Sequence, residues 1–298
     1  MKYTVYEKNI NRAVAYVEKN IKTNVSYAGA ALAAGMSPDN FWRVFKKLFK
    51  ETAVSYIRGR KLTLIAKKIL KTRRSINEIS YEYGYESQEV FTRSFKKRFG
   101  MTPAAYRKKG RRFYFLEKHR LDEVSVRHIL CGGISLEPKI VRIKEFKIRG
   151  IGRRLRVNGC VKNSGKAFIK AGEGRGETAK NCGRKIFAYI EAVKSSGIRQ
   201  ILADDEFFVL IGCEKWKLPG AGTVKKIGAG RYAKFMHRGP PENTPVSYRY
   251  IFGNWMEKKN LKNQPAYFFE CAAARGRTAE KFQTEIYIPL MRQGKGRG

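Results

Sequence analysis

Cysteine and histidine are scarce in this sequence, which has five cysteines and three histidines among 298 residues. No two cysteines form a C-x-x-C pair, and the histidines form no ligand cluster with them. Structural zinc sites need such spacings, and an odd number of scattered thiols does not suggest a disulfide framework. We therefore expect reduced thiols in a cytosolic protein that uses no metal and no cofactor.

Long apolar runs are also missing. No uninterrupted apolar stretch approaches the ~18 residues that a membrane-spanning helix needs. The N-terminus has no apolar core of the kind that secretory signals carry. We therefore expect neither a membrane span nor a signal peptide.

Acidic residues are too few to balance the basic ones. Lys and Arg number 63 against 25 Asp and Glu, which gives a net charge of +38. Both parts of the chain contribute, since residues 1–110 hold 24 basic and 8 acidic groups and residues 111–298 hold 39 and 17. Such an excess favours a polyanion such as a nucleic acid as partner. Selection for solubility is the alternative, and charge alone separates the two poorly.

A short phrase occurs twice, as FKKLF at 45–49 and FKKRF at 95–99. The match extends to 43–56 and 93–106, and each copy is preceded by a glycine, Gly35 or Gly84, set between two helical patterns. A fixed-period repeat of this kind indicates two copies of one structural unit. Each copy is predicted to be a helix, a tight turn and a second helix.

The second helix of each copy has a clear N-cap and an apolar stripe. Ser37 and Ser87 are the predicted caps. The stripes are expected to contain Phe41, Val44, Phe45 and Leu48 in the first copy, and Phe91, Phe95 and Phe99 in the second. Basic residues lie off these stripes. A basic solvated helix would look the same in one copy, but two copies favour a pair of DNA-binding helix-turn-helix units joined by a helical connector over 54–70.

The stretch SINEISYEYGYESQEVFTRSFKKRFGMTPAAYRKKG at 75–110 resembles the signature of the AraC/XylS family of bacterial transcription regulators. The resemblance covers about residues 5–110 and implies binding to two successive major-groove boxes of double-stranded DNA, with RNA polymerase as a further partner. By position, it implies base-reading roles for Asp39, Asn40, Trp42, Arg43, Gln88, Glu89, Thr92 and Arg93. It implies phosphate contacts for Lys46, Lys47, Lys96 and Lys97. Trp42 could instead cover the turn, and Asp39 could serve the helix N-terminus.

The sequence changes character after a basic linker predicted at 111–137. Short strand-like runs are predicted at 141–152, 206–212, 231–237, 266–270 and 285–290, with helices around 181–195 and 245–259. We therefore predict a multidomain protein, with an all-α domain at 1–110 and an α+β domain with an antiparallel sheet at 138–298.

Several phrases of this second domain resemble the GyrI-like effector-binding domain, namely residues 218–241, AYFFE at 266–270 and EIYIPL at 285–290. The complete layout is similar to the Rob-type regulators. The resemblance covers about 138–291 and implies a duplicated β-α-β-β unit with a ligand cleft that is lined by aromatic residues and a buried acid. The candidates are Glu270 as the acid, with Glu285 as its rival, and Trp216, Tyr232, Phe235, Tyr250, Trp255 and Phe268 as the walls.

These features predict a sequence-specific DNA-binding regulator that senses a small lipophilic or cationic effector and is not an enzyme. The basic excess of the second domain leaves an anionic or protein partner open. Two other functions stay open as well. One is hydrolysis of a small molecule with Glu270 and a nearby tyrosine as acid or base, and the other is nonspecific nucleic-acid binding.

Overall fold

The structure is a computed structural model of the whole chain. It describes residues 2–22, 25–114, 116–156, 185–195, 197, 201–215, 222–259, 261, 265–273 and 282–291. The chain divides into two compact units. The helical unit contains residues 1–132 and 248–260, and the sheet unit contains 133–247 and 261–298. Within the described residues, no helix has the length and apolar character needed to cross a membrane.

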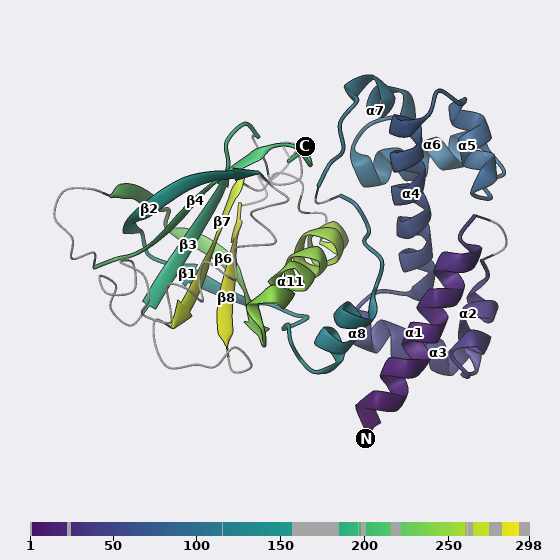
Figure 1. Cartoon of the computed structure of the whole chain (residues 1–298), viewed down its shortest axis with the longest axis horizontal. Coiled ribbons are helices and arrows are strands. Elements are labelled where there is room, and N and C mark those ends of the chain that lie inside the picture. The colour runs from purple at the N-terminus through teal and green to yellow at the C-terminus, as the bar shows by residue number, and fades with distance from the viewer. Residues whose placement is uncertain are drawn as a thin grey trace, which may run out of the picture. The chain divides into compact units, whose positions relative to one another are not determined.

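The helical unit is built around two long helices, α1 and α4. Its elements are α1 (Lys2–Asn20), α2 (Tyr27–Ala33), α3 (Pro38–Phe49), α4 (Ala53–Lys71), α5 (Ile76–Glu82), α6 (Gln88–Phe99), α7 (Pro103–Lys109) and α8 (Glu123–Leu130). Helix α4, shown vertically in Figure 1, connects the α2–α3 pair to the α5–α6 pair. This arrangement confirms the predicted double helix-turn-helix and its helical connector.

Each helix-turn-helix turns at the predicted glycine. Gly35 and Gly84 have φ angles of 64° and 73°, a left-handed conformation that glycine adopts with little strain. The following helix begins at the predicted cap, because Ser37 accepts a hydrogen bond from the Asn40 amide and Ser87 accepts one from the Glu89 amide. These local signals explain why the sequence alone located both turns.

Three phenylalanines seat each second helix on its core. Phe41, Phe45 and Phe49 are buried along α3, with ring centroids 5.5 and 4.7 Å apart. In α6 the matching rings of Phe91, Phe95 and Phe99 are buried at spacings of 5.6 and 4.5 Å. Val44 and Leu48, which were predicted to share the buried stripe of α3, are only half-buried. The stripe follows the i, i+4, i+8 positions because these face the core.

Residues 112–114 and 116–121, within the predicted basic linker, fold back along α4. The Lys118 amide donates to Thr63 Oγ1 at 2.8 Å, and Arg60 Nη1 donates to the Lys118 carbonyl at 2.7 Å. Arg112 holds the buried Glu117 carboxylate at 2.6 Å. These buried contacts and α8 make the segment up to residue 132 part of the helical unit.

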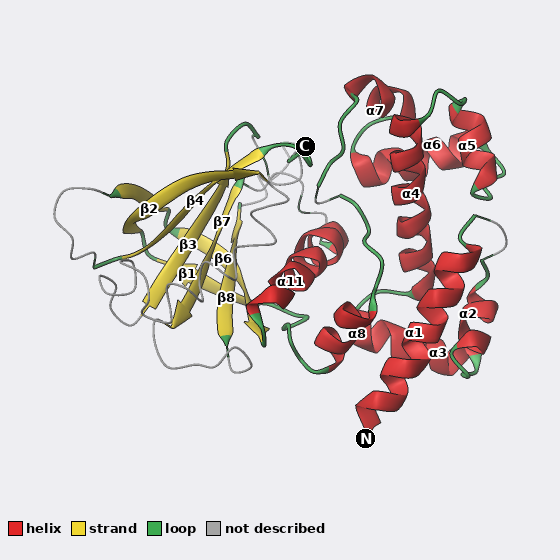
Figure 2. Cartoon of the chain, viewed as in Figure 1, coloured by secondary structure: helices red, strands yellow, loops and turns green. Residues whose placement is uncertain are grey.

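The described residues of the sheet unit form an antiparallel sheet of eight strands (Figure 2). The strands are β1 (Lys139–Ile143), β2 (Phe146–Arg156), β3 (Lys185–Ala192), β4 (Glu206–Cys213), β5 (Thr223–Ile227), β6 (Gly230–Arg238), β7 (Tyr267–Ala273) and β8 (Gln283–Leu290). Their order in the sheet is β1-β6-β8-β7-β3-β4-β2-β5. The predicted fold class, an all-α domain followed by an antiparallel sheet domain, is confirmed.

Two helices were predicted among these strands, and one of them is wrong. Residues 181–195 contain strand β3 rather than a helix. Strand β3 pairs with β4 and β7 along its two edges. The five consecutive residues from Ile186 to Ile190 are all buried, so the side chains on both faces of this strand are covered. Such a strand loses the alternation that distinguishes strands from helices.

The helix predicted at 245–259 is present as α11 (Thr244–Tyr250), a π-helical turn (Ile251–Trp255) and α12 (Met256–Lys258). The chain thus runs β6–α11–β7–β8, which is one β-α-β-β unit. Strands β2, β3 and β4 follow the same order, and the segment between β2 and β3 falls at 157–184, outside the described residues.

Candidate DNA-reading helices and effector-binding sheet

Helix α3 turns its polar side chains outward. Asp39, Trp42 and Arg43 are exposed and Asn40 is half-buried, because the phenylalanine stripe occupies the opposite side of the helix. The Lys46 ammonium lies 4.3 Å from the centroid of the Trp42 ring, which is a cation–π contact between two side chains one helical turn apart. The candidate base-reading residues of the first copy therefore share one accessible face.

Helix α6 repeats this arrangement at the second copy. Gln88, Glu89 and Arg93 are exposed and Thr92 is half-buried. Guanidinium and amide side chains on such a face can pair with the edges of guanine and adenine in a major groove. Their roles as base readers remain predictions that follow from the family resemblance.

The four candidate phosphate contacts are also accessible. Lys46, Lys47, Lys96 and Lys97 are exposed. Arg98, the next residue in α6, behaves differently because it is buried and its Nη1 donates to both Glu257 oxygens at 2.8 and 2.7 Å. The lysines can position the domain on DNA without reading its sequence, whereas Arg98 has a structural partner.

Residues 248–260 of the helical unit hold the C-terminal end of α3. Asn254 Nδ2 donates to the Phe49 carbonyl at 3.0 Å, and the Lys258 ammonium lies 3.5 Å from the Lys50 carbonyl. Asn254 also donates to the buried Glu51 carboxylate at 3.1 Å. The same carboxylate forms an ion pair with Lys118. Burial raises the pKa of Glu51, and the Lys118 charge opposes this shift. Asn254 and Lys258 thus supply hydrogen-bond donors to carbonyl groups at the end of α3 that have no partner within the helix.

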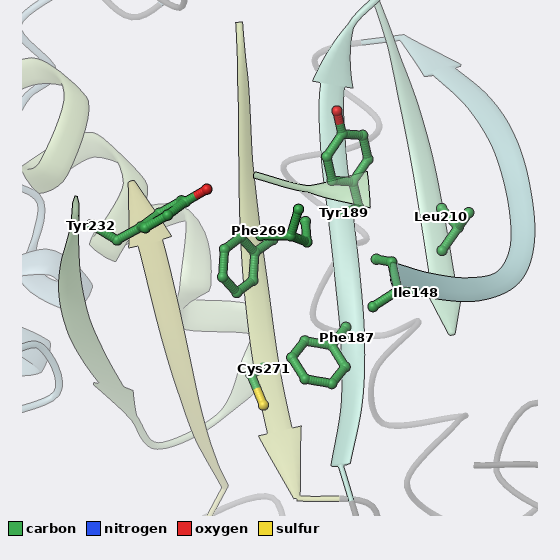
Figure 3. Close-up of a cluster of buried hydrophobic side chains, with 8 residues drawn as sticks. Ile148, Phe187, Tyr189, Leu210, Tyr232, Phe269 and Cys271 are labelled. Carbon is green, nitrogen blue, oxygen red and sulfur yellow. The ribbon is translucent and has the colours of Figure 1, made fainter. Parts of the chain in front are cut away.

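The sheet carries an aromatic cluster on one side, which we call the aromatic face (Figure 3). Its buried members include Phe187 and Tyr189 on β3, Tyr232 on β6 and Phe269 on β7. The Tyr287 ring stacks on Phe269 at 4.5 Å, and the Tyr232 and Tyr267 hydroxyls are 2.9 Å apart. Tyr267 and Tyr287 are half-buried, so this face offers flat apolar surfaces with hydroxyl groups at their edge.

Two carboxylates on the aromatic face are already paired with lysines. Glu285 accepts from Lys234 at 2.8 Å and from the Tyr287 hydroxyl at 2.6 Å, and Glu191 pairs with Lys225 at 2.5 Å. Burial acts to raise the pKa of Glu285, but the hydrogen bonds from Lys234 and Tyr287 outweigh it and the pKa is lowered. Glu285 is therefore ionised and neutralised by its neighbour.

Glu270 lies on the opposite face of the sheet. Strand alternation separates it from Phe269 and Cys271, and it pairs across the strands with Ala188 and Ile286. Its side chain is buried, and its Oε1 has no hydrogen-bond partner among the described residues. Burial raises its pKa to about 8, so the carboxyl group is protonated at neutral pH.

The structure distributes the predicted effector residues over several places. Phe235 and Phe268 share the face of Glu270, whereas Tyr232 lies on the aromatic face. Tyr250 and Trp255 are buried in the part of α11 and its π turn that belongs to the helical unit. Trp216 falls outside the described residues.

Sequence reasoning missed the lysine partners of the acids on the aromatic face. Lys234 and Lys225 are distant in sequence from Glu285 and Glu191. Lys234 meets Glu285 through the pairing of β6 with β8, whereas Lys225 on β5 meets Glu191 on β3 although β2 and β4 lie between these strands in the sheet order. A partial signal was present, because Glu285 and Tyr287 are two residues apart in a strand-like run and must share a face.

Comparison with known proteins agrees with this architecture. Residues 30–109 match the family described as a helix-turn-helix domain, and residues 187–291 match the GyrI-like small molecule binding domain. The chain is 28% identical over 190 residues to the uncharacterized HTH-type transcriptional regulator YbfP of Bacillus subtilis, an alignment covering 54% of this chain and 64% of that protein. It is 32% identical over 102 residues to the regulatory protein SoxS of Escherichia coli, covering 34% of this chain and 95% of that protein.

A solved structure of a putative bacterial transcription regulation protein from Staphylococcus aureus is 16% identical. It covers 53% of this chain and 100% of its own, with a TM-score of 0.39. The chain spans less than two thirds of YbfP but nearly the whole of SoxS. From the helix-turn-helix and GyrI-like matches, the likeness to SoxS, and the double helix-turn-helix followed by an antiparallel sheet, the chain belongs to the AraC-type family of transcriptional regulators, with a GyrI-like small-molecule-binding domain in its C-terminal part.

Proposed function

We propose that this protein regulates transcription in the bacterial cytoplasm by reading two successive major-groove boxes and by sensing a small molecule with its sheet unit. The observation that carries the DNA half of this proposal is the repeated exposed face. Residues at matching positions, such as Arg43 and Arg93, are exposed on α3 and α6. Major-groove segments on one side of a duplex recur every ~34–36 Å, so one chain with two such helices can engage both.

The division of labour between the exposed residues supports sequence-specific binding. Arg43 and Arg93 are suited to contact base edges, whereas Lys46 and Lys96 are suited to contact phosphates. Contact with RNA polymerase is part of the proposal because regulators of this family act on transcription.

Selection of bound sites from a random duplex library tests the DNA half. We expect a motif with two boxes. We expect Arg93→Ala to cost ~1–3 kcal/mol on the selected site and to relax the base preference of one box. Lys96→Ala is the matched control, because it should weaken the selected and random duplexes alike. Equal losses on both duplexes for Arg93→Ala would contradict base reading by Arg93.

The aromatic face supports the effector half. A flat lipophilic ligand could stack on Tyr267 and Tyr287 with its polar group near Glu285. A cationic ligand would compete with Lys234 for that carboxylate, or would require Glu270 to lose its proton at a cost set by burial. Glu285 and Glu270 therefore imply different binding sites for a cationic ligand.

Binding of a lipophilic cation to the Glu285→Gln and Glu270→Gln variants separates the two acids. Loss in Glu285→Gln alone would place the ligand on the aromatic face, and loss in Glu270→Gln alone would place it on the opposite face. Unchanged binding in both variants would contradict an acid-dependent effector site. Turnover of a small ester that disappears in Glu270→Gln would instead assign hydrolysis to this domain.

A route from effector to DNA is part of the proposal. Residues 248–260 lie within the match to the GyrI-like domain but belong to the helical unit, where they contact the ends of α3 and α6. An effector that favours one position of this segment would shift the population of DNA-competent recognition helices.

A further inference from the structure

The helical unit contains a hollow of about 250 Å³ that no feature of the proposed function uses. Its wall comes from three parts of the unit, namely the start of α2, the N-terminal half of α4 and the turn between α5 and α6. The hollow therefore lies between the two helix-turn-helix copies, beside the connector that joins them.

The lining of this hollow is apolar and aromatic. Val54 and Ile57 of α4 form one side, and the rings of Tyr27, Tyr83 and Tyr85 contribute from the two copies. Aliphatic and aromatic walls of this kind suit a flat apolar ligand body, and pockets for small molecules combine such walls with a few polar groups. A bare phosphate of a DNA backbone would leave these walls in contact with water.

Two cations, Arg58 and Lys61, complete the lining, and none of the described residues that line the hollow is acidic. Arg58 is exposed and lies near Tyr85. Burial raises the pKa of Tyr85 to about 12, and the Arg58 charge opposes this shift. Lys61 is half-buried, and burial lowers its pKa. The hollow thus has a positive electrostatic character at a partly desolvated position.

Lys61 differs from the other inward-facing cations of the same unit. Arg60 pairs with Glu18 at 2.7 Å, and Lys118 pairs with the buried Glu51. Lys61 follows Arg60 directly in α4, and it has no ion pair with a described residue. A cation that is partly removed from water is stabilised by an anion close to it, and none of the described residues supplies one to Lys61.

We propose that the hollow is a binding site for a small aromatic carboxylate. The carboxylate would pair with Lys61 and Arg58, and the ring would lie against the tyrosine rings and the aliphatic side of α4. This site is separate from the sheet unit and from the effector proposed for it.

The position of the hollow gives such a ligand access to both recognition helices. The Tyr27 hydroxyl donates to the carbonyl of Pro38, the first residue of α3. Gly84 and Tyr85 directly precede Ser87, the N-cap of α6. A bound ligand contacts the entry to both helices at once, so it biases how the two copies are held relative to α4.

Binding of 1-naphthoate and of its neutral analogue 1-naphthamide to the full-length protein tests this inference by titration calorimetry. The two probes have nearly the same shape and differ in charge. We expect naphthoate to bind about tenfold more tightly than naphthamide, as expected for an ion pair worth about 1.4 kcal/mol. Lys61→Met should remove this preference, and Val54→Trp, which fills the hollow, should abolish binding of both probes.

Lys71→Met is the matched control, because Lys71 is an exposed lysine at the end of the same helix. It should leave naphthoate binding unchanged. Equal affinity for the two probes, or unchanged naphthoate binding in Lys61→Met, would overturn the proposal. A Lys61→Met variant that loses affinity for every duplex but keeps its affinity for naphthoate would assign the two cations to DNA phosphates instead.

Discussion

The two helix-turn-helix copies have the same aromatic anchors but different ends. The C-cap of α6 is Gly100, which has a φ angle of 78° and whose amide donates to the Lys96 carbonyl at 2.8 Å. The C-cap of α3 is Lys50, which adopts a left-handed φ of 54° without being a glycine. The Phe49 carbonyl at this end accepts from Asn254. The second copy closes its own helix, whereas the first depends on a segment about 200 residues further along the chain.

The first helices of the copies differ as well. Ser75 and Glu78 form a reciprocal capping box at α5. At α2 the cap Ser26 acts alone, and Gly29 occupies the position of Glu78. A Cβ atom at Gly29 would lie 2.0 Å from the Tyr16 hydroxyl oxygen, so packing against α1 requires the glycine. The two copies therefore share the phenylalanines that anchor their second helices. They differ where the first copy contacts α1 and residues 248–260.

The phenylalanine anchors that the two copies share should contribute most to stability. Phe45→Ala and Phe95→Ala each remove a buried ring and should each lower the free energy of unfolding by ~3–5 kcal/mol. The measurement is urea unfolding followed by helical circular dichroism. Leu32→Ala, at an exposed position, should change it by less than ~0.5 kcal/mol. A loss at Phe45 much smaller than at Phe95 would show that the copies are not equivalent in their cores.

A second prediction extends the comparison to the acids on the two faces of the sheet. Glu270 has a raised pKa of about 8, so the folded state keeps a proton that the unfolded state releases above its ordinary pKa. The stability due to this proton is present at low pH and is lost as pH rises toward 8. Between pH 5 and 7.5 the protein should lose ~3 kcal/mol of stability that Glu270→Gln does not lose.

Glu285→Gln provides the control for this pH series. The pKa of Glu285 is lowered, so the group is ionised in both states across the same range and its stabilising effect is lost only at lower pH. The wild-type and Glu285→Gln profiles should therefore run parallel between pH 5 and 7.5. A wild-type profile parallel to that of Glu270→Gln would contradict a protonated Glu270.

The third prediction concerns the second copy's link to residues 248–260. Glu257→Gln weakens the pair with buried Arg98 and should cost ~1–2 kcal/mol of stability, a value reduced from that of a fully buried pair because Glu257 is partly exposed. Urea unfolding measures this cost. Glu242→Gln, at an exposed residue, is the control, and equal stability of the two variants would show that the pair contributes nothing.

The fourth prediction exchanges the residues that end α3 and α6. Lys50→Gly should stabilise the protein by ~1 kcal/mol and Gly100→Lys should destabilise it by a similar amount, because a left-handed conformation costs a non-glycine residue ~1–2 kcal/mol. Thermal unfolding of both variants measures the difference. The same sign for both substitutions would show that contacts with residues 248–260, and not backbone strain, decide the stability of Lys50.

The smallest effect concerns the N-caps. Ser75→Ala should cost ~1 kcal/mol and Ser26→Ala about half as much, because Ser75 belongs to a capping box and Ser26 does not. Chemical unfolding of the two variants under the same conditions makes the comparison. A larger loss at Ser26 would contradict the importance of the reciprocal bond with Glu78.

The helical unit could be predicted well because its signals are local. A serine cap, a glycine turn and phenylalanines four residues apart lie within about a dozen residues, and they occur twice. The sheet was harder because its contacts are remote. The pattern at β3 predicts a helix because both faces of this strand are buried. The separation of Tyr232 from Glu270 follows from the register of β6, β8 and β7, which puts the two side chains on opposite faces of the sheet. No local pattern specifies that register.

We propose that α3 and α6 enter neighbouring major grooves of one duplex. Hydroxyl-radical footprinting on a selected site tests it most directly, with the wild-type protein, Arg43→Ala and Arg93→Ala. We predict two protected boxes on one face, centred about 10–10.5 base pairs apart, with each variant losing protection at a different box. Protection of a single box, or loss of both boxes equally in each variant, would contradict the binding of α3 and α6 to separate boxes.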